Sequence, residues 1–217
     1  MLTKSETWLK MSKASDRRDQ QRTDLIAAAE RTIAASGLAG LKTRDLARAI
    51  GVANGAVYNL VADLDELILH VSSRTLRRLG AAVATADNDQ ANPPLDRLTR
   101  IALAYSDFAT GNLELWRSLF EHRMAPGKTA PDWARNEQLD VFRYILQPLR
   151  ALLPAASETD LGLAARSLFS AIHGIVALGL DQQLVGVPQD LLDAQIPIMV
   201  RAMVTGLVEA GAPTPPE

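Results

Sequence analysis

Apolar residues along this chain recur three or four positions apart, the spacing that places them on one face of an α-helix. Two such series stand out, Leu161, Ala165, Leu168, Ile172, Ile175 and Gly179 in the first, and Leu192, Ile196, Met199, Met203 and Gly206 in the second. No segment shows the alternation of apolar and polar residues that is typical of a half-buried strand. The pattern predicts an all-α fold.

Clusters of Gly, Pro and Asn divide the pattern into about nine helices. We expect helices at about 19–36, 43–50, 54–60, 63–79, 95–110, 113–124, 132–153, 158–184 and 189–210. Asp63 starts the fourth of these helices, and Glu66 follows three residues later, which is a capping-box pattern. The helix at 158–184 is apolar on two sides, and Pro197 should kink the helix at 189–210. A helix apolar on two sides must be covered on both, which predicts that the last two helices pack on a second subunit as well.

The segment Thr43–Val61 predicts two short helices joined by a tight turn. Leu46 and Ile50 lie on one face of the first helix, and Val57 and Val61 lie on one face of the second. Gly51 between them can adopt a left-handed backbone that ends the first helix. We expect the side chain of Asn54 to cap the second helix. Two helices joined by a short turn that contains Gly form a helix-turn-helix, whose second helix lies in the major groove of DNA.

Outward-facing residues of this segment are suited to contacts with DNA. Ala56 can touch a thymine methyl group, and Asn side chains can pair with adenine. The hydroxyl of Tyr58 can reach a phosphate, and Arg44 is long enough to reach a guanine edge. The free N–H groups at the start of the first helix also favour a phosphate. The predicted DNA-binding residues are Thr43, Arg44, Asn54, Gly55, Ala56, Tyr58 and Asn59.

The run LKTRDLARAIGVANGAVYNLVADLDELI resembles the DNA-binding segment of the tetracycline-repressor (TetR) family of transcriptional regulators. The positions that match the family pattern are Thr43, Leu46, Ala47, Gly51, Val52, Gly55, Tyr58, Asp63 and Leu67. The chain departs from it at Leu60, Val61 and Leu64, where His, Phe and Lys are usual. Because the His and Lys positions commonly serve phosphates in the family, their replacement bears on the affinity for DNA.

Two motifs further along resemble the branch of the family that has a WHG-type C-terminal domain. The run GNLELWRSLFEHR at 111–123 keeps Leu115, Arg117, Leu119 and Phe120 of the branch pattern. In LFSAIHGIVALGL at 168–180, the pair His173-Gly174 matches. The resemblance implies an inducer pocket in the C-terminal domain and a homodimer through the last two helices, at about 158–210.

Composition narrows the function further. The chain has 217 residues and no Cys, so it has neither disulfides nor a thiolate metal site. Residues 1–80 hold thirteen Lys and Arg against nine Asp and Glu, a net charge of +4, while residues 81–217 hold ten against sixteen, a net charge of −6. The basic part coincides with the predicted helix-turn-helix, as DNA binding requires. A chance segregation of surface charge is the alternative.

Three domains are expected: a flexible basic arm at 1–18, a helix-turn-helix domain at 19–63 and a helical ligand-binding and dimerisation domain at 64–217. The arm either contacts DNA or is a solvated tail, and Met11 offers an alternative start of translation. With no signal peptide and no uninterrupted apolar run of membrane-spanning length, we expect a cytoplasmic protein without a membrane partner. No catalytic motif, metal site or cofactor site is recognisable, so an enzyme is not expected.

Aromatic residues are concentrated in the C-terminal part of the chain. An apolar cavity with a few polar groups is typical of a small-molecule site. The candidate ligand-binding residues are Tyr105, Phe108, Trp116, Phe120, Phe169 and His173. The alternative for each ring is that it only fills the core, and for His173 that it is a buried His satisfied by one hydrogen bond.

The expected function is a ligand-responsive regulator, a dimeric repressor that binds a palindromic DNA operator through the helix at about 54–60. A small molecule in the C-terminal domain would release it from the operator. The alternative, suggested by Leu60 and Leu64, is a helical ligand- or protein-binding module that has lost operator binding. The sequence does not identify the effector, the operator, the regulated genes, or whether the protein represses or activates.

Overall fold

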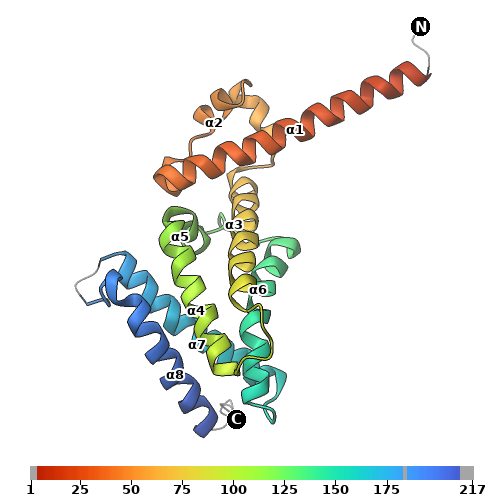
Figure 1. The fold of residues 1–217 in the computed structure, drawn as a ribbon. Coiled ribbons are helices and arrows are strands. Elements are labelled where there is room, and N and C mark those ends of the chain that lie inside the picture. The colour runs from red at the N-terminus through yellow and green to blue at the C-terminus, as the bar shows by residue number, and fades with distance from the viewer. Residues whose placement is uncertain (1–3, 183–184, 211–217) are drawn as a thin grey trace. The chain divides into compact units, whose positions relative to one another are not determined.

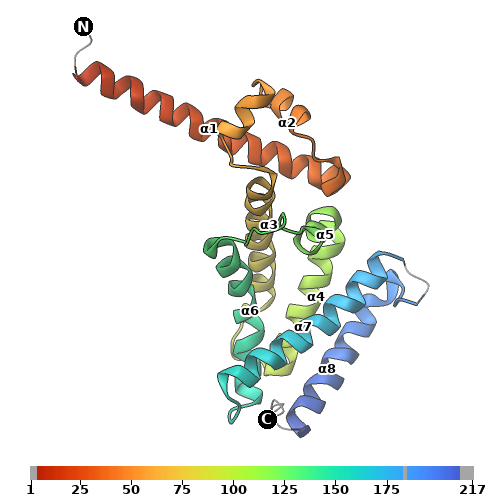
Figure 2. The same ribbon diagram turned by 180° about the vertical axis from the view of Figure 1, so that it is seen from behind.

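The computed structural model describes residues 4–182 and 185–210, and its side chains from residue 15 onward. All regular structure in these residues is helical, which confirms the predicted fold class (Figures 1 and 2). The α-helices are α1 (Lys4–Ser36), α2 (Thr43–Ala49), α3 (Leu64–Ala86), α4 (Pro94–Gly111), α5 (Leu113–Glu121), α6 (Asp132–Leu152), α7 (Glu158–Leu180) and α8 (Leu192–Ala210). Short 3-10 helices are η1 (Leu38–Gly40), η2 (Asn54–Asn59) and η3 (Gln189–Leu191).

The chain forms two compact units, and the division between them falls within α3. Unit 1 comprises the residues up to Thr75 together with Glu114–Ala130. Unit 2 comprises Leu76–Leu113 together with the residues from Pro131 onward. The helix-turn-helix segment therefore lies in unit 1, and most of the apolar C-terminal part lies in unit 2. The functional domains expected at 1–18, 19–63 and 64–217 stay a prediction.

The core of unit 1 is built from one apolar side of each of its helices. Leu25 and Ile33 of α1, Leu46 of α2, Val57 of η2 and Leu115 of α5 belong to one buried cluster. Their burial removes apolar surface from water, which stabilises the fold by about 25 cal/mol for each Å² buried. The cluster holds the two helix-turn-helix elements against α1, and so determines which of their side chains remain outside.

The first helix begins at Lys4, and the expected start at Asp19 was wrong. The segment 4–36 contains neither Gly nor Pro, so no residue in it breaks the helix. The predicted flexible arm is therefore helical from Lys4 onward, and residues 1–3 lie outside the described part of the chain. In both views of unit 1, the N-terminal half of α1 extends beyond the part that contacts α2 (Figures 1 and 2).

Unit 2 is a helical bundle in which α4 packs against α6 and α8, while α7 packs against α6 and α8. Ile101 of α4, Leu149 of α6, Leu168 of α7 and Ile196 of α8 are among its buried residues. Ser157 caps α7, since its hydroxyl accepts a hydrogen bond of 3.2 Å from the Asp160 N–H. This helix ends at Leu180, whereas the end predicted at Leu184 lies outside the described residues.

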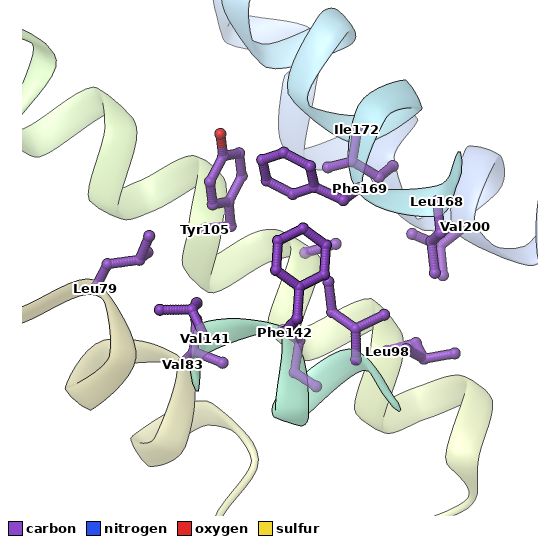
Figure 3. Close-up of a pocket in the computed structure, with 13 residues that line it drawn as sticks. Leu79, Val83, Leu98, Tyr105, Val141, Phe142, Leu168, Phe169, Ile172 and Val200 are labelled. Carbon is purple, nitrogen blue, oxygen red and sulfur yellow. The ribbon is translucent and has the colours of Figure 1, made fainter. Parts of the chain in front are cut away.

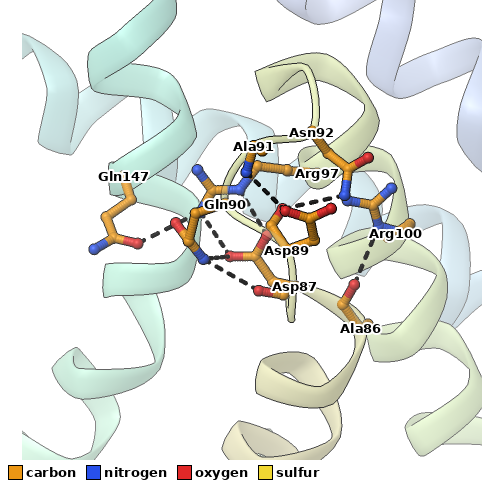
Figure 4. A network of polar contacts seen from close by, with 9 residues as sticks. All are labelled: Ala86, Asp87, Asp89, Gln90, Ala91, Asn92, Arg97, Arg100 and Gln147. Carbon is orange, nitrogen blue, oxygen red and sulfur yellow. Dashed lines mark hydrogen bonds and ion pairs between the residues drawn. The ribbon is translucent and has the colours of Figure 1, made fainter.

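A buried ion pair connects the end of α3 to the start of α4 (Figure 4). Arg97 donates two hydrogen bonds to Asp87, of 2.7 Å from Nε and 2.8 Å from Nη2. The two side chains are only 8% and 1% exposed. Gln90 donates a further hydrogen bond to the carboxylate, and Arg97 donates one to the side-chain oxygen of Gln147. This bidentate geometry is the strong form of an Arg–carboxylate pair.

The ion pair also shifts the titration of both groups. Hydrogen bonding from Arg97 lowers the pKa of Asp87 and outweighs the opposing effect of burial. Hydrogen bonding to Asp87 in turn raises the pKa of Arg97. Because the folded pKa of Asp87 is depressed, its stabilising contribution is present above its unfolded pKa of about 3.9. That contribution is lost as the pH falls through the folded pKa.

One side of α7 and one side of α8 remain uncovered within the described chain. On α7, the residues of this side are Leu163, Ser167, Ser170, Gly174 and Leu178. On α8, Ile198 is 57% exposed and Val208 is 46% exposed. By length and composition alone, α7 and the segment Gln189–Ala210 are apolar enough to cross a membrane. Their most apolar windows are only 33% and 22% buried, so much of this apolar surface is not used inside the subunit.

Replacing Arg97 with Ala should strongly destabilise the protein, because Asp87 would remain buried without its partner. We expect a loss of about 3–5 kcal/mol in the free energy of unfolding, measured by urea denaturation at pH 7. The double variant Asp87→Leu/Arg97→Met should lose less than the single variant, because it leaves no unpaired charge. Equal losses for the two variants would contradict the assignment.

Candidate functional site

The helix-turn-helix is formed by α2, a tight turn and η2, all within unit 1. Gly51 has a φ of +70°, the left-handed conformation expected for the residue that ends the first helix. The N–H of Val52 donates to the Ala47 carbonyl at 3.0 Å and closes the turn. The second element is a 3-10 helix preceded by Ala53, and no side chain caps it. The predicted cap by Asn54 was therefore wrong, because Asn54 is already the first residue of η2.

The predicted DNA-binding residues lie on the outside of these two elements. Arg44, Asn54, Gly55, Tyr58 and Asn59 are exposed, whereas Thr43 and Ala56 are partly exposed. The side chain of Tyr58, which is 53% exposed, has no place in the core. All seven residues thus lie on one short segment and are at least partly exposed. Their contacts with DNA stay a prediction.

Arg18 is a neighbour of this segment that the sequence analysis did not select. Its Nη2 donates a hydrogen bond of 2.6 Å to the Asn59 carbonyl at the end of η2. The two residues are 41 positions apart in the chain, so no local pattern pointed to the contact. The basic character of the N-terminal segment was the only signal. Arg18 thus adds a positive charge beside η2.

The three residues that depart from the family pattern have structural roles. Leu60 and Val61 are 8% and 4% exposed and belong to the core of unit 1. Leu64 is partly buried and packs against the same cluster. Their side chains stabilise the domain that carries η2. The alternative that operator binding has been lost stays a prediction.

The start of α3 is fixed by two reciprocal hydrogen bonds. The Asp63 carboxylate accepts from the Glu66 N–H at 2.8 Å, and the Glu66 carboxylate accepts from the Ala62 N–H at 2.6 Å. This confirms the predicted capping role of Asp63, with Ala62 in place of Asp63 as the donor to Glu66. Burial raises the pKa of Glu66, but hydrogen bonds from Ala62 and His70 and the charge of Arg22 lower it further, so the net shift is downward.

The segment after α5 contacts the same helix start. Lys128 forms an ion pair with Asp63, and its hydrogen bond lowers the pKa of that carboxyl. Asp65 accepts a hydrogen bond of 3.2 Å from the Ala125 N–H, and His122 Nε2 lies 3.5 Å from its other oxygen. Burial lowers the pKa of His122 even though Asp65 opposes this. These contacts hold α3 at its junction with the helix-turn-helix.

Unit 2 contains an apolar cavity of about 60 Å³ (Figure 3). Five helices contribute to its wall, and almost all the surface that they expose to it is hydrocarbon. The lining residues are Leu79, Val83, Leu98, Ile101, Ala102, Tyr105, Val141, Phe142, Ile145, Leu168, Phe169, Ile172 and Val200.

Three aromatic rings form one side of the cavity wall. The ring of Phe169 forms T-shaped pairs with those of Tyr105 and Phe142, at centroid distances of 5.7 and 5.3 Å. On another side, Phe169 stacks on His173 at 5.5 Å. The Tyr105 hydroxyl lies 2.7 Å from Nδ1 of His173. Burial lowers the pKa of His173, so its ring is neutral at pH 7 and can accept this hydrogen bond.

Of the six predicted ligand-binding residues, the structure brings together Tyr105, Phe169 and His173. Phe108 is buried one turn further along α4 and is not a lining residue. Trp116 and Phe120 lie in unit 1, where their rings pack together at 5.5 Å. Phe142 and the aliphatic residues of the wall were missed, because an aliphatic residue that lines a cavity has the same helical spacing as one that fills the core.

A helix-turn-helix with an exposed second element, and a separate helical unit with an apolar cavity, define a class of proteins. It is the class of DNA-binding regulators with a helical C-terminal domain. The family model described as "Tetracyclin repressor-like, C-terminal domain" matches residues 98–203. Over these residues the chain is similar to the C-terminal domain of TetR-like transcriptional regulators, which are not enzymes.

Curated and solved proteins of this kind are similar to the chain over more of its length. The HTH-type transcriptional regulator BetI of Stenotrophomonas maltophilia is 28% identical over 158 residues, which cover 71% of this chain and 79% of BetI. A solved protein of unknown function from Rhodococcus sp. RHA1 has a TM-score of 0.70 and 26% identity, over 87% of this chain and 95% of that chain. BioQ, solved with its natural double-stranded DNA operator, has a TM-score of 0.62 and 20% identity, over 87% and 98% of the two chains.

Replacing Gly51 with Ala tests the turn. No atom lies within 4 Å of the position of the added Cβ, so the cost comes from the left-handed backbone alone. We expect a loss of roughly 1–2 kcal/mol in the free energy of unfolding. The matched control is Gly55→Ala, where the added Cβ also meets open space but φ is not positive. The turn assignment fails if the two variants are equally stable.

Proposed function

We propose that this protein is a ligand-responsive dimeric repressor that binds a palindromic operator through η2. The proposal rests on one observation, which is that the helix-turn-helix buries one side of its two elements and exposes the other. Leu46 and Val57 hold the two elements to the core, while Arg44 of α2 and Asn54 and Tyr58 of η2 remain exposed. An element that is anchored on one side and presents polar side chains on the other is suited to the major groove.

Each exposed residue has a proposed contact. Arg44 and Asn54 donate to base edges, and Ala56 packs against a thymine methyl group. Tyr58 and Thr43 contact phosphates, and the exposed Gly55 and Asn59 lie where the backbone approaches the groove. The net charge of +4 on residues 1–80 supports the proposal, because phosphate contacts supply much of the affinity for DNA. BioQ, a chain of the same fold, binds double-stranded DNA.

The two uncovered sides of α7 and α8 support a homodimer. On α7 this side combines the small residues Ser170 and Gly174 with Leu163 and Leu178, so a partner helix can approach closely. A second copy of the chain would remove these apolar side chains, and Ile198 of α8, from water. Four helices, two from each subunit, would then form the interface. The motifs at 111–123 and 168–180 further support the WHG-type branch of the family.

The cavity in unit 2 is the proposed effector site. Leu79 and Val83 of α3 line it, and α3 continues past Thr75 to the helix start that is fixed by Asp63. A molecule that moves these two side chains therefore acts on the helix that begins beside η2. It changes the affinity for DNA only if it binds the two states of the protein differently. In a dimer, the reading elements must be spaced by about one DNA turn, ~34 Å.

The test of the proposed function is a gel shift with the DNA upstream of the protein's own gene, with salt titrated. We expect a sequence-selective shift with two chains per site and an affinity that falls steeply with salt. The absence of a shift on every fragment at low salt would overturn operator binding.

Replacing Arg44 with Ala should weaken operator binding by roughly 1–3 kcal/mol at constant salt if its guanidinium pairs with a base. The control is Arg135→Ala, which removes the same exposed charge from α6 in unit 2 and should leave the affinity unchanged. Equal affinities of the Arg44 variant and the parent protein would remove Arg44 from the set of base contacts.

Replacing Ile198 with Asp should prevent dimerisation, because two copies would bury unpaired carboxylates in an apolar interface. Size-exclusion chromatography with light scattering should then give the mass of one chain in place of two. The matched control is Leu139→Asp on α6, since Leu139 and Ile198 are 58% and 57% exposed. A dimer that persists in the Ile198 variant would show that the interface lies elsewhere.

A further inference from the structure

The cavity in unit 2 also indicates the chemistry of its ligand. We infer that the effector is a small, uncharged and apolar molecule. The inference rests on the proposed function in assuming that this cavity is the effector site. It adds the charge, polarity and size of the molecule, each of which follows from the wall.

The residues that line the cavity exclude a charged ligand. None of the described residues in its wall carries a charge. Arg97 precedes the lining residue Leu98, but its guanidinium is engaged by Asp87 through two hydrogen bonds. A charged ligand would have to leave water without an opposite charge to compensate, which costs far more than burying a neutral group.

Polarity is restricted by the single hydroxyl group in the wall. Tyr105 is the one lining residue with a polar side chain, and its hydroxyl is paired with His173 at 2.7 Å. A ligand that needed a hydrogen bond from this hydroxyl would have to break the existing one. Because a buried polar group without a hydrogen-bond partner is destabilising, a ligand without polar groups is favoured.

The aromatic rings do not form a cage for a cation. Phe169 forms T-shaped pairs with Tyr105 and Phe142, and it stacks on His173. It is thus packed against three neighbouring rings, whereas a cation needs a free ring face within about 6 Å of the centroid. These rings instead offer hydrocarbon edges, which favour packing against an aromatic or aliphatic molecule.

The size of the ligand follows from the volume of the cavity and from the exposure of its wall. The cavity measures about 60 Å³, whereas an engineered apolar cavity of about 150 Å³ holds benzene. A single ring therefore requires one wall to move outward. Val141, Phe142 and Ile145 of α6 are partly exposed, while Leu98, Leu168 and Val200 of the other walls are buried. All three lining residues of α6 are partly exposed, so this wall is the one that a ligand can displace most easily.

The experiment compares three molecules that share one ring and differ in charge: toluene, benzoate and benzylammonium. Binding to the full-length protein at pH 7 is measured by calorimetry, and DNA release by gel shift. We expect the Kd of toluene to be at least tenfold lower than that of either ion. Ala102→Leu, which fills the cavity, should weaken toluene binding at least tenfold, and the exposed control Ala151→Leu should not.

The outcomes separate the ligand chemistry from the regulation. Benzoate or benzylammonium binding as tightly as toluene, or no binding of toluene up to its solubility, would overturn the inference. Toluene binding that is abolished by Ala102→Leu would support the inference. If toluene binds in this way but does not release the protein from DNA, the proposed regulation is contradicted. Should Ala102→Leu fail to fold, Ala102→Val makes the same test with a smaller addition, and its toluene binding must also weaken.

Discussion

The buried ion pair between Asp87 and Arg97 is the constraint on which the arrangement of unit 2 depends. Two charges that are almost fully removed from water are stable only as a pair in good geometry. The pair fixes the end of α3 relative to the start of α4. Since both helices line the apolar cavity, the ion pair also determines the shape of the proposed effector site.

In unit 1, packing onto the core determines which side chains remain exposed. Packing of η2 and α2 onto the core leaves their polar residues outside, and the reciprocal hydrogen bonds of Asp63 and Glu66 define where α3 begins. Leu60 illustrates the consequence. A residue at a position where the family commonly has a phosphate contact is here part of the core, so the surface proposed to bind DNA consists of fewer residues around η2.

Local patterns predicted the helices well and the long-range contacts poorly. Gly51 was expected to end the first helix of the motif because a left-handed backbone favours glycine, and it does. The start of α1 was misplaced because polar residues without Gly or Pro are compatible with both a helix and a flexible arm. Arg18 was missed because its partner, Asn59, is distant in the chain.

The sequence by itself determined the all-helical fold and the helix-turn-helix, because these depend on residue spacing within short segments. Only the tertiary structure decided which aromatic residues share a cavity. Tyr105, Phe169 and Phe142 come from three helices that pack together, whereas Trp116 and Phe120 belong to the other unit although their helix directly follows α4. Helical periodicity shows which side of a helix is buried, but it does not show what lies opposite that side.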